Sequence, residues 1–404
     1  RSQDFLDGFE YILNSAKAKR AEFILLCRDV FDSLELIPHI YEKTLGLIDK
    51  FKLDTKNRIP IIAIEGNHDC RNFALGARYE ESSSWLKILA KTNHLILLST
   101  PDFEETEQII EEYDTNTKSG NFYVLNDTEI IGLTYSGEEP MDEINRLIFE
   151  LKKKPTSKFR ILMAHMGIRG QLPDIPNIPA PSYANIEDLR KYIDYLALGH
   201  FHLKFQLENW VFNPGACETV NISERDFKSG IFYVETKKIE EQESDTKKIE
   251  DESQQNNETI IQNDDINQDS SENGIFKPRY KNIVTFLEPK QRPMIYLEQD
   301  ARILEDMDKL IRICNIRVGR YMSEKKPMLY IKFRNTASLN KMKSKMTYLD
   351  NKRKQLINEC GLFDAEFNTK PSKDPVDEFM ARTLTLTDYI PFGSLYDEQD
   401  GEND

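Results

Sequence analysis

Four segments of the sequence end an apolar run with side chains that can bind a metal ion. These segments are Cys27-Arg28-Asp29-Val30-Phe31-Asp32, Gly66-Asn67-His68-Asp69, Met163-Ala164-His165 and Gly199-His200-Phe201-His202. They hold four of the six histidines, while His39 and His94 fall in helical or loop patterns. A mixture of carboxylate, amide and imidazole donors suits Mn²⁺, Fe or Zn²⁺ better than a set of thiolates would.

The candidate metal ligands are Asp29, Asn67, His165, His200 and His202. His200 and His202 are two residues apart, so in an extended segment their imidazoles point to the same side and could each serve one metal of a pair. Asp29 could bridge two ions, which would clamp a phosphate and activate a water for in-line attack. A single histidine at a strand end is usually structural, and a lone G-N-H-D is often a turn. Four such ends in one chain favour a metal site.

The elements that must position these residues alternate between helix and strand. Apolar periodicity predicts helices over 4–19, 33–51 and 140–154, and strands over 21–27, 58–66, 129–135, 158–165, 194–200, 209–215 and 229–235. This alternation predicts an α/β layered domain with a substantial sheet. Because the carboxyl ends of such strands lie along one edge, the four polar segments are expected to meet there.

Beyond residue 235 the composition changes twice. Residues 236–274 are acidic and polar with almost nothing to bury, which predicts a disordered linker that acts as a passive tether. A strand at 283–289 closes the first domain or bridges to the second. Residues 292–373 then show a β-α-β-α-β rhythm: strands 292–298, 326–334 and 362–369, with helices 301–314 and 339–360. We therefore predict domains at 1–235 and 275–373, followed by an acidic tail at 374–404.

The net charge of −15 is unevenly distributed. Residues 275–373 carry 22 Lys/Arg against 11 Asp/Glu, whereas 236–274 carry 4 against 12 and 374–404 carry 1 against 9. The basic stretch predicts a surface that attracts phosphate backbones, and the alternative is a lysine-rich solvated surface. Five widely spaced cysteines, no run of 18 apolar residues and no visible secretory signal favour an intracellular protein with reduced thiols.

The ordered motifs resemble those of the calcineurin-like metallophosphoesterase superfamily, whose pattern is D-x-H, G-D-x-x-D, G-N-H-[DE], a lone H and G-H-x-H. Within it, the chain resembles the DNA double-strand-break repair nucleases of the meiotic recombination eleven family, in an archaeal-type form. The opening stretch 4–32, HMGIRGQ (165–171) and NPGACETVNISERDFKSGIFYVE (213–235) carry this likeness. It implies an αββα metallophosphoesterase sandwich with a smaller β-α-β-α-β DNA-capping domain.

The resemblance also implies roles for individual residues. Asp29 would bridge two Mn²⁺ ions, Asn67, His165 and His200 would complete one site, and His202 would ligate the other ion. His68 would orient the phosphate or act as general acid. The implied activity is 3′→5′ exonuclease and single-strand endonuclease action on DNA in double-strand-break repair. The implied partners are DNA, an ABC-type coiled-coil ATPase that the 374–404 tail would dock, and a second copy in a homodimer formed near the N-terminal helices. The expected location is intracellular and DNA-associated, which for an archaeal source means the cytoplasm or nucleoid.

Two departures from the family pattern affect these expectations. The given sequence starts after the place where the D-x-H strand would stand, so one metal site is expected to be only partly present. The residue before Asp29 is Arg28 where the family has Gly, and an arginine there is expected to crowd the site or lower metal affinity. A catalytically impaired scaffold that bridges DNA and the ATPase, and a phosphoesterase acting on another substrate, are therefore the alternatives.

Overall fold

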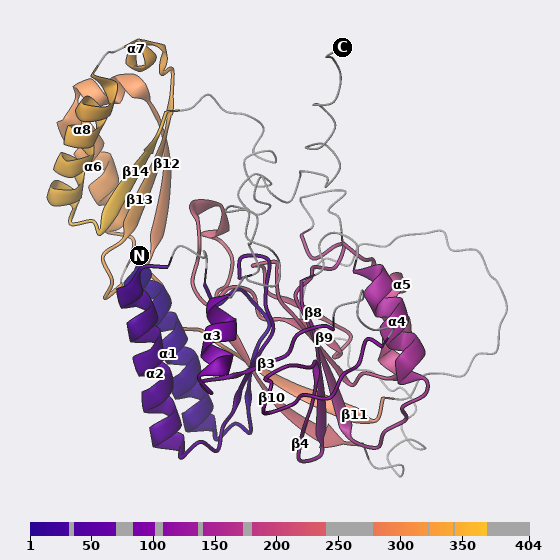
Figure 1. Cartoon of the computed structure of the whole chain (residues 1–404). Helices are drawn as coiled ribbons and strands as arrows, with labels where there is room; N and C mark the ends of the chain where they lie inside the picture. Colours follow the sequence, from indigo (N-terminus) through magenta and orange to yellow (C-terminus); the bar gives the residue numbers. More distant parts are fainter. Residues whose placement is uncertain are drawn as a thin grey trace, which may run out of the picture.

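The computed structural model describes residues 1–31, 36–69, 84–101, 108–135, 140–172, 180–239, 278–321, 323–341 and 344–369. Asp32, residues 240–274 of the predicted linker and the predicted tail 374–404 lie outside the described residues. The start of the linker predicted at 236–274 is wrong, because residues 236–238 continue the strand Ile231–Lys238. Figure 1 shows a larger body at the N-terminal side of the chain and a smaller one built from its last elements.

Two sheets form the centre of the larger body. The first has the order β1-β2-β3, with parallel strands Ile24–Leu26, Ile61–Ala63 and Ile96–Leu97. The second has the order β4-β5-β6-β7-β9-β8. Its strands are Phe122–Leu125, Thr128–Leu133, Phe159–Ala164, Tyr195–Leu198, Val211–Asn213 and Phe205–Leu207, in that order. β5, β6, β7 and β9 run parallel, while β4 and β8 are antiparallel edge strands.

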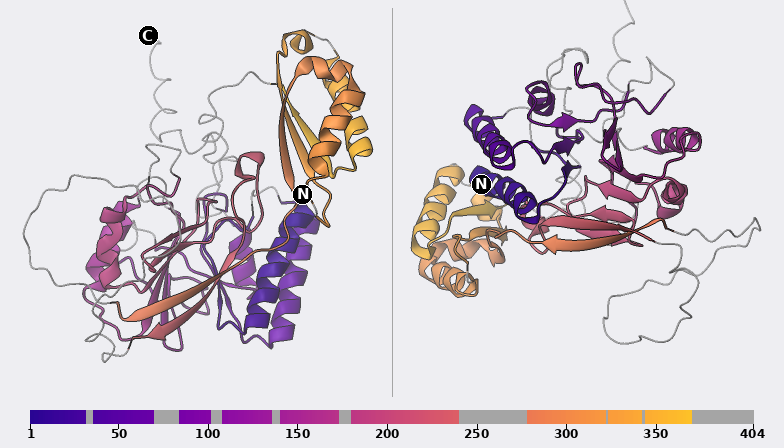
Figure 2. Two further views of the ribbon diagram at one scale, coloured as in Figure 1. Left: turned by 180° about the vertical axis from the view of Figure 1, so that it is seen from behind. Right: turned by 90° about the horizontal axis from the view of Figure 1, so that it is seen from below.

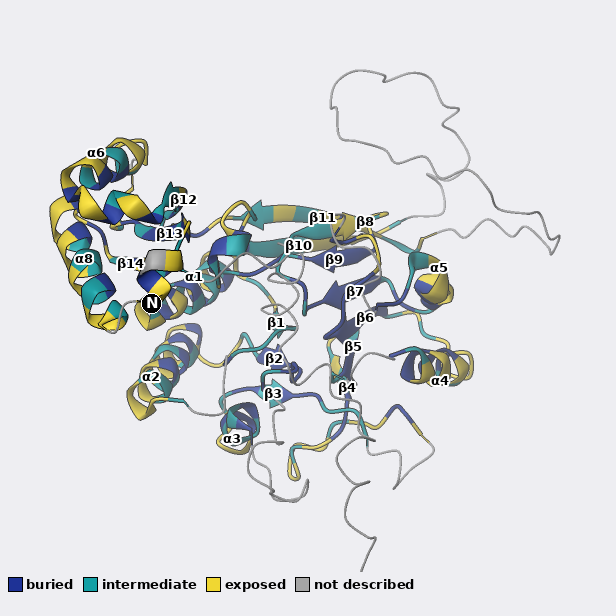
Figure 3. Cartoon of the chain, turned by 90° about the horizontal axis from the view of Figure 1, so that it is seen from above, coloured by how far each residue is buried: buried dark blue, intermediate teal, exposed yellow. Residues whose placement is uncertain are grey.

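Helices cover the outer face of each sheet (Figures 2 and 3). The first sheet is covered by α1 (Ser2–Lys19), α2 (Pro38–Thr55) and α3 (Trp85–Lys91). The second is covered by α4 (Met141–Leu151), α5 (Tyr183–Ile186) and the 3-10 helix η2 (Glu187–Lys191). The helix predicted from residue 33 begins at Pro38, whose fixed φ suits a first helical position.

Alternating strand residues fill three apolar layers. In β6, Phe159, Ile161 and Met163 pack between the two sheets, whereas Leu162 and Ala164 pack against the helices. The same alternation divides β2 and its end, where Ile62 and Ile64 face the second sheet and Ile61 and Ala63 face α1–α3. Both faces of each strand are therefore apolar, as expected for parallel strands covered on both sides. The predicted αββα sandwich is confirmed.

A long antiparallel pair completes this body. β10 (Ile231–Lys238) pairs with β11 (Tyr280–Leu287) over their whole length, from Ile231–Leu287 to Lys238–Tyr280. Phe232, Val234, Tyr280 and Val284 pack against the apolar layer between the sheets. The range 275–373 therefore contributes its first strand to the sandwich, and the body of the capping domain begins at β12.

The smaller body has its own core. Parallel strands β12 (Met294–Asp300), β13 (Met328–Arg334) and β14 (Asp364–Asn368) form one sheet in that order. The 3-10 helix η5 (Ala301–Glu305) and the helices α6 (Met307–Val318), α7 (Ala337–Asn340) and α8 (Lys345–Cys360) cover one face. The β-α-β-α-β order predicted from the sequence is the order observed. We call this body the capping domain.

One expected helix is wrong in detail, because residues 339–360 form two helices and not one. Leu339 and Leu349 are both buried in the core of the capping domain. Leu339 comes from α7 and Leu349 from α8, so each helix contributes a leucine to this core.

An ion cluster joins the capping domain to α1. Asp4 is 1% exposed, although it lies on the first turn of the chain's first helix. Its carboxylate accepts hydrogen bonds from Arg292 Nε (2.7 Å) and Nη2 (3.0 Å) and from Lys325 Nζ (3.2 Å). Burial raises the pKa of Asp4, but these two cations hold it below its ordinary value. In the described part of the chain, no helix is both long and apolar enough to cross a membrane.

Candidate metal centre

The carboxyl ends of four parallel strands place the predicted ligands. Asp29 follows β1, Asn67 follows β2, His165 follows β6 and His200 follows β7. His165 Nε2 lies 3.0 Å from Asn67 Oδ1 and 3.6 Å from Asp29 Oδ2. The ring of His200 stands 5.2 Å from that of His165, measured between centroids. The two sheets therefore contribute donors to one cluster, which we call the strand-end cluster: Asp29, Asn67, His165 and His200.

Hydrogen bonding fixes the tautomer of His165. His165 Nδ1 lies 3.0 Å from the carbonyl oxygen of Cys27, which can only accept, so Nδ1 carries the proton. The pKa of His165 is lowered chiefly by burial, so the ring is neutral and its lone pair is on Nε2. Nε2 therefore faces the amide oxygen of Asn67 and the carboxylate of Asp29. Three electron-pair donors directed at one another repel unless a cation lies among them.

The chemistry of these donors fits a divalent metal ion. Two ligands at right angles around an ion, each about 2.1 Å from it, are separated by roughly 3 Å, close to the distance from His165 to Asn67. Within the described residues, Asn67 Nδ2 has no hydrogen-bond partner although it is buried, so no other contact in that part fixes the amide. Counting only His, Cys, Asp and Glu, no group of three in the described residues could hold a metal. The set therefore needs the Asn67 oxygen.

His200 is held in an unusual backbone conformation. Its φ is +68°, in the left-handed region that non-glycine residues seldom adopt and that is often found at functional sites. The ring packs against Tyr135 (5.7 Å between centroids) and Phe201 (5.0 Å). Burial and the neighbouring His165 lower the pKa of His200 to about 3, so this imidazole is also neutral and can act as a ligand.

His202 and His68 lie beside the strand-end cluster with different partners. His202 Nδ1 contacts Glu224 Oε1 at 2.9 Å. The backbone N–H of His68 donates to Asp29 Oδ1 at 2.7 Å, and its side chain is half-buried. Burial raises the pKa of Asp29, but the hydrogen bond from the His68 backbone helps to hold it below its ordinary value. A role for His68 as general acid stays a prediction.

The sequence analysis gave Asp69 no role, although it belongs to the G-N-H-D motif. Its buried carboxylate accepts from the backbone N–H groups of Gly66, Val30 and Phe31, each at 3.3 Å. Burial and the nearby charge of Asp29 raise the pKa of Asp69 well above its ordinary value. Asp69 therefore ties the turn after β2 to the segment after β1, which fixes Asn67 relative to Asp29.

Two glycines allow the backbones to approach at the site. A Cβ on Gly66 would lie 2.2 Å from Asp29 Oδ1 and 2.5 Å from His165 Cε1. A Cβ on Gly199 would lie 1.7 Å from the carbonyl oxygen of Cys27. Any side chain at either position would displace a candidate ligand or the carbonyl that orients His165.

Arg28 points toward the G-H-F-H loop. Its Nη2 donates to Asn213 Oδ1 (3.0 Å) and to the carbonyl oxygen of Phe201. Asn213 Nδ2 in turn donates to the carbonyl oxygens of Gly199 (2.9 Å) and Phe201 (3.1 Å). The guanidinium thus helps to hold the loop that carries His200 and His202. Burial lowers the pKa of Arg28 to about 10, so it remains a cation near Asp29.

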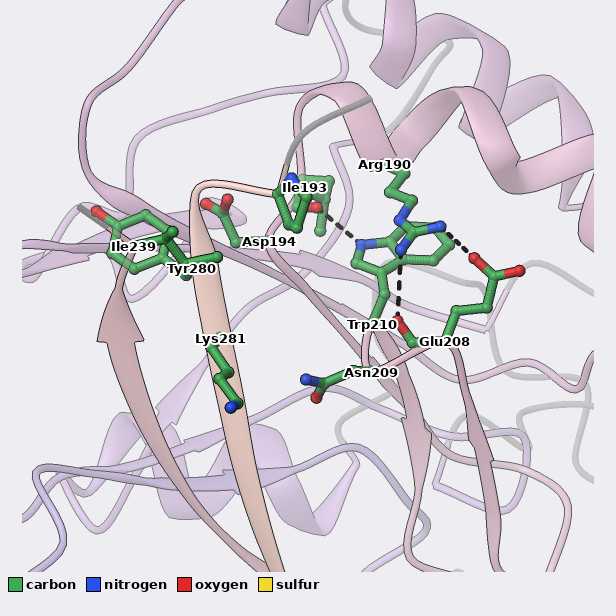
Figure 4. A pocket seen from close by; sticks show the side chains of 10 residues that line it. Arg190, Ile193, Asp194, Glu208, Asn209, Trp210, Ile239, Tyr280 and Lys281 are labelled. Carbon is green, nitrogen blue, oxygen red and sulfur yellow. Dashed lines mark hydrogen bonds and ion pairs between the residues drawn. The ribbon is translucent and has the colours of Figure 1, made fainter. Parts of the chain in front are cut away.

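A cavity of about 240 Å³ lies at the opposite edge of the second sheet (Figure 4). Its walls include Asp194, which precedes β7, together with Trp210, Tyr280 and Lys281. Trp210 Nε1 donates to Ile193 O at 2.7 Å, and Arg190 pairs with Glu208. His200 follows the other end of β7, so this cavity is separate from the strand-end cluster.

Comparison with known proteins agrees with this fold. The calcineurin-like phosphoesterase family model matches residues 3–204, half of the chain. The chain therefore belongs to the calcineurin-like phosphoesterase family. It is similar to the DNA double-strand break repair protein Mre11 of Archaeoglobus fulgidus, with 26% identity over 227 residues (55% of this chain, 47% of that protein). It is also similar to the Mre11 protein of Sulfurisphaera tokodaii, with 28% identity over 211 residues (52% and 46%). The matches span about half the length of these relatives.

Proposed function

We propose that this chain is a Mn²⁺-dependent DNA nuclease subunit that acts in double-strand-break repair. The observation that carries the proposal is the group of facing acceptor atoms on Asp29, Asn67 and His165 at the ends of β1, β2 and β6. Family membership supports phosphoester hydrolysis, and the names of the relatives support DNA as the substrate. The activities proposed are 3′→5′ exonuclease on duplex DNA and endonuclease on single strands.

Asp29, Asn67, His165 and His200 would hold one divalent ion, and His202 would contribute to a second ion bridged by Asp29. Such ions stabilise negative charge on a phosphoryl group and supply a hydroxide nucleophile near neutral pH. Neutral imidazoles at His165 and His200 leave the nitrogen lone pairs available for this role. His68, held by its backbone N–H on Asp29, would donate a proton to the leaving 3′ oxygen as general acid.

The capping domain would supply the DNA-binding charge. Exposed cations follow one another along α6 and its C-terminal end: Lys309, Arg312, Arg317 and Arg320. Such a row can neutralise phosphates without reading the base sequence. We further propose an ABC-type coiled-coil ATPase as partner, docked by the segment 374–404, and a homodimer formed near the N-terminal helices. The complex would act on DNA inside the cell.

The test is cleavage of a 3′-labelled DNA duplex by the purified chain with Mn²⁺, compared with a cyclic nucleotide and a phosphoprotein. Release of the 3′ label as mononucleotide that stops on chelation supports the nuclease. Turnover of either alternative substrate with none of DNA would establish a different phosphoesterase.

A second candidate, a DNA-binding scaffold with impaired catalysis, is favoured by one observation. The charge of the Arg28 guanidinium interacts electrostatically with Asp29, where a cation opposes metal binding. DNA binding without cleavage at any Mn²⁺ concentration would support the scaffold, whereas metal-dependent cleavage would exclude it.

A further inference from the structure

Glu224 is a buried carboxylate with three hydrogen-bond donors around it. Its side chain accepts from Asn221 Nδ2 (2.9 Å) and from the backbone N–H of Val220 (3.0 Å), and it contacts His202 Nδ1 at 2.9 Å. Glu224 is 3% exposed, and it ends the short 3-10 helix η3 (Ile222–Glu224).

Both oxygens of Glu224 accept from N–H groups that can only donate, Oε1 from Asn221 Nδ2 and Oε2 from the Val220 backbone. The carboxylate therefore acts as an acceptor, and the proton between the two side chains belongs to His202 Nδ1. A neutral His202 with its proton on Nδ1 has its lone pair on Nε2, the ring nitrogen that does not contact Glu224. Histidine ligands of metals commonly donate their other ring N–H to a carboxylate in this way. His165 is fixed in the same tautomer by the Cys27 carbonyl, so two predicted ligands share one protonation pattern.

The turn that carries Glu224 is braced from both sides. Asn221 caps η3 by accepting the N–H of Ser223 at 2.9 Å. On the other side, the guanidinium of Arg225 lies 5.1 Å from the centre of the Tyr296 ring on β12, and Tyr296 stacks on Tyr330 of β13. Glu224 is thus held between the sandwich and the capping domain, so its carboxylate has little freedom to leave His202.

We propose that Glu224 is a positioning residue that keeps His202 in the Nδ1–H tautomer, with Nε2 presented as a metal ligand. The inference rests on the proposed function in one respect, the assignment of His202 as a ligand. Glu224 lies 22 residues beyond His202, outside the G-H-F-H motif.

The test is the tautomer of His202 in the full chain without metal, read from long-range proton–nitrogen correlations of ¹⁵N-labelled histidine. The His202 signals are assigned with a His202→Asn variant. We expect the proton on Nδ1 in the unchanged chain. In Glu224→Gln an amide N–H replaces one acceptor, so the Nε2–H tautomer should increase and Mn²⁺ affinity, measured by calorimetry, should fall about 10–100-fold.

The matched control is Glu218→Gln, another buried glutamate of the same segment that pairs with Arg1. It should leave both the tautomer and the Mn²⁺ affinity unchanged. An Nε2–H tautomer in the unchanged chain would overturn the proposal whether or not any variant folds, and so would an unaltered tautomer in Glu224→Gln. A chain that shows the expected tautomer and affinities but does not cleave DNA would refute the proposed nuclease while leaving the role of Glu224 intact.

Discussion

At the scale of single residues, the contact between His165 and Asn67 is the observation that favours the proposed metal site over an ordinary polar cluster. In a polar cluster a donor meets an acceptor, whereas here the Cys27 carbonyl leaves His165 Nε2 without a proton and directed at an amide oxygen. In His68, the backbone N–H donates a hydrogen bond to Asp29, and the imidazole is the part proposed to transfer a proton.

The first prediction follows from this division of roles. His68→Ala should lower Mn²⁺-dependent DNA cleavage about 10²–10⁴-fold, because general acid catalysis commonly contributes that much. Mn²⁺ affinity by calorimetry should stay within a few-fold, since the backbone bond to Asp29 remains. His39→Ala, an exposed histidine on α2, is the control. Equal loss of metal affinity and cleavage would instead make His68 a ligand.

The second prediction concerns Arg28. Restoring the family residue with Arg28→Gly removes the hydrogen bonds to Phe201 O and Asn213, so the free energy of unfolding should fall by about 2 kcal/mol. Chemical denaturation measures this change, and Mn²⁺ calorimetry on the same variant shows its effect on the site. A tighter Mn²⁺ affinity in the variant would show that the guanidinium opposes the metal, while a weaker one would show that it supports the loop.

The strand-end residues were predictable because motif and topology act together. Apolar runs place Asp29, Asn67, His165 and His200 after strands, and the sheet brings such ends to one edge. Glu224, Asp69 and Tyr135 were missed for a physical reason. They act through the burial and contacts that the folded chain gives them, and a glutamate 22 residues from its histidine has no distinguishing local pattern.

At the scale of secondary-structure elements, only some of the strands were predicted from the sequence. The apolar runs that form β6 and β7 were predicted, whereas β3 and β8, with two and three residues, were not. Helix α1 was predicted, but the burial of its Asp4 is explained only by the hydrogen bonds from Arg292 and Lys325.

The third prediction concerns the segment between the sandwich and the capping domain. Burial and the Asp4 carboxylate raise the pKa of Glu218 from 4.5 to about 7. A carboxyl whose folded pKa is raised binds its proton more tightly when folded, so stability falls as pH rises from about 4.5 to 7. Over this pH range the shifted pKa of Glu218 should lower the free energy of unfolding by about 3 kcal/mol.

Glu218→Gln should remove that slope, because glutamine does not ionise. The measurement is the free energy of unfolding by denaturant at pH 5, 6, 7 and 8, compared between the two proteins. We expect the variant to gain relative stability as the pH rises. Parallel curves over the whole range would show that Glu218 has an ordinary pKa in the folded protein.

At the scale of the whole molecule, charge separates the two bodies. The capping range carries an excess of cations, while the rest of the chain is acidic. A protein with this distribution can hold DNA on one body and remain repelled from it elsewhere.

The fourth prediction tests that division on the full chain. Replacing Arg312, Arg317 and Arg320 together by Ala should weaken duplex binding and reduce the slope of log affinity against log salt by about 0.9 for each phosphate that is no longer neutralised. Arg302→Ala is the control, because Arg302 is exposed but already paired with Asp300 at 2.7 Å. Binding is followed by fluorescence anisotropy from about 50 to 200 mM salt. A slope equal to that of the unchanged chain would show that DNA does not bind at α6.

The pairing of β10 with β11 bears on how many residues the chain can hold between these two strands. Their ladder ends where the N–H of Ile239 donates to the carbonyl oxygen of Arg279 at 2.9 Å, so the chain departs and returns at adjacent points. Closing a loop of twice the length costs only about 0.6 kcal/mol more, so the number of residues between these points is weakly constrained. Insertions there should be tolerated in evolution, and the same place offers a permissive position for a fused reporter whose own ends lie close together.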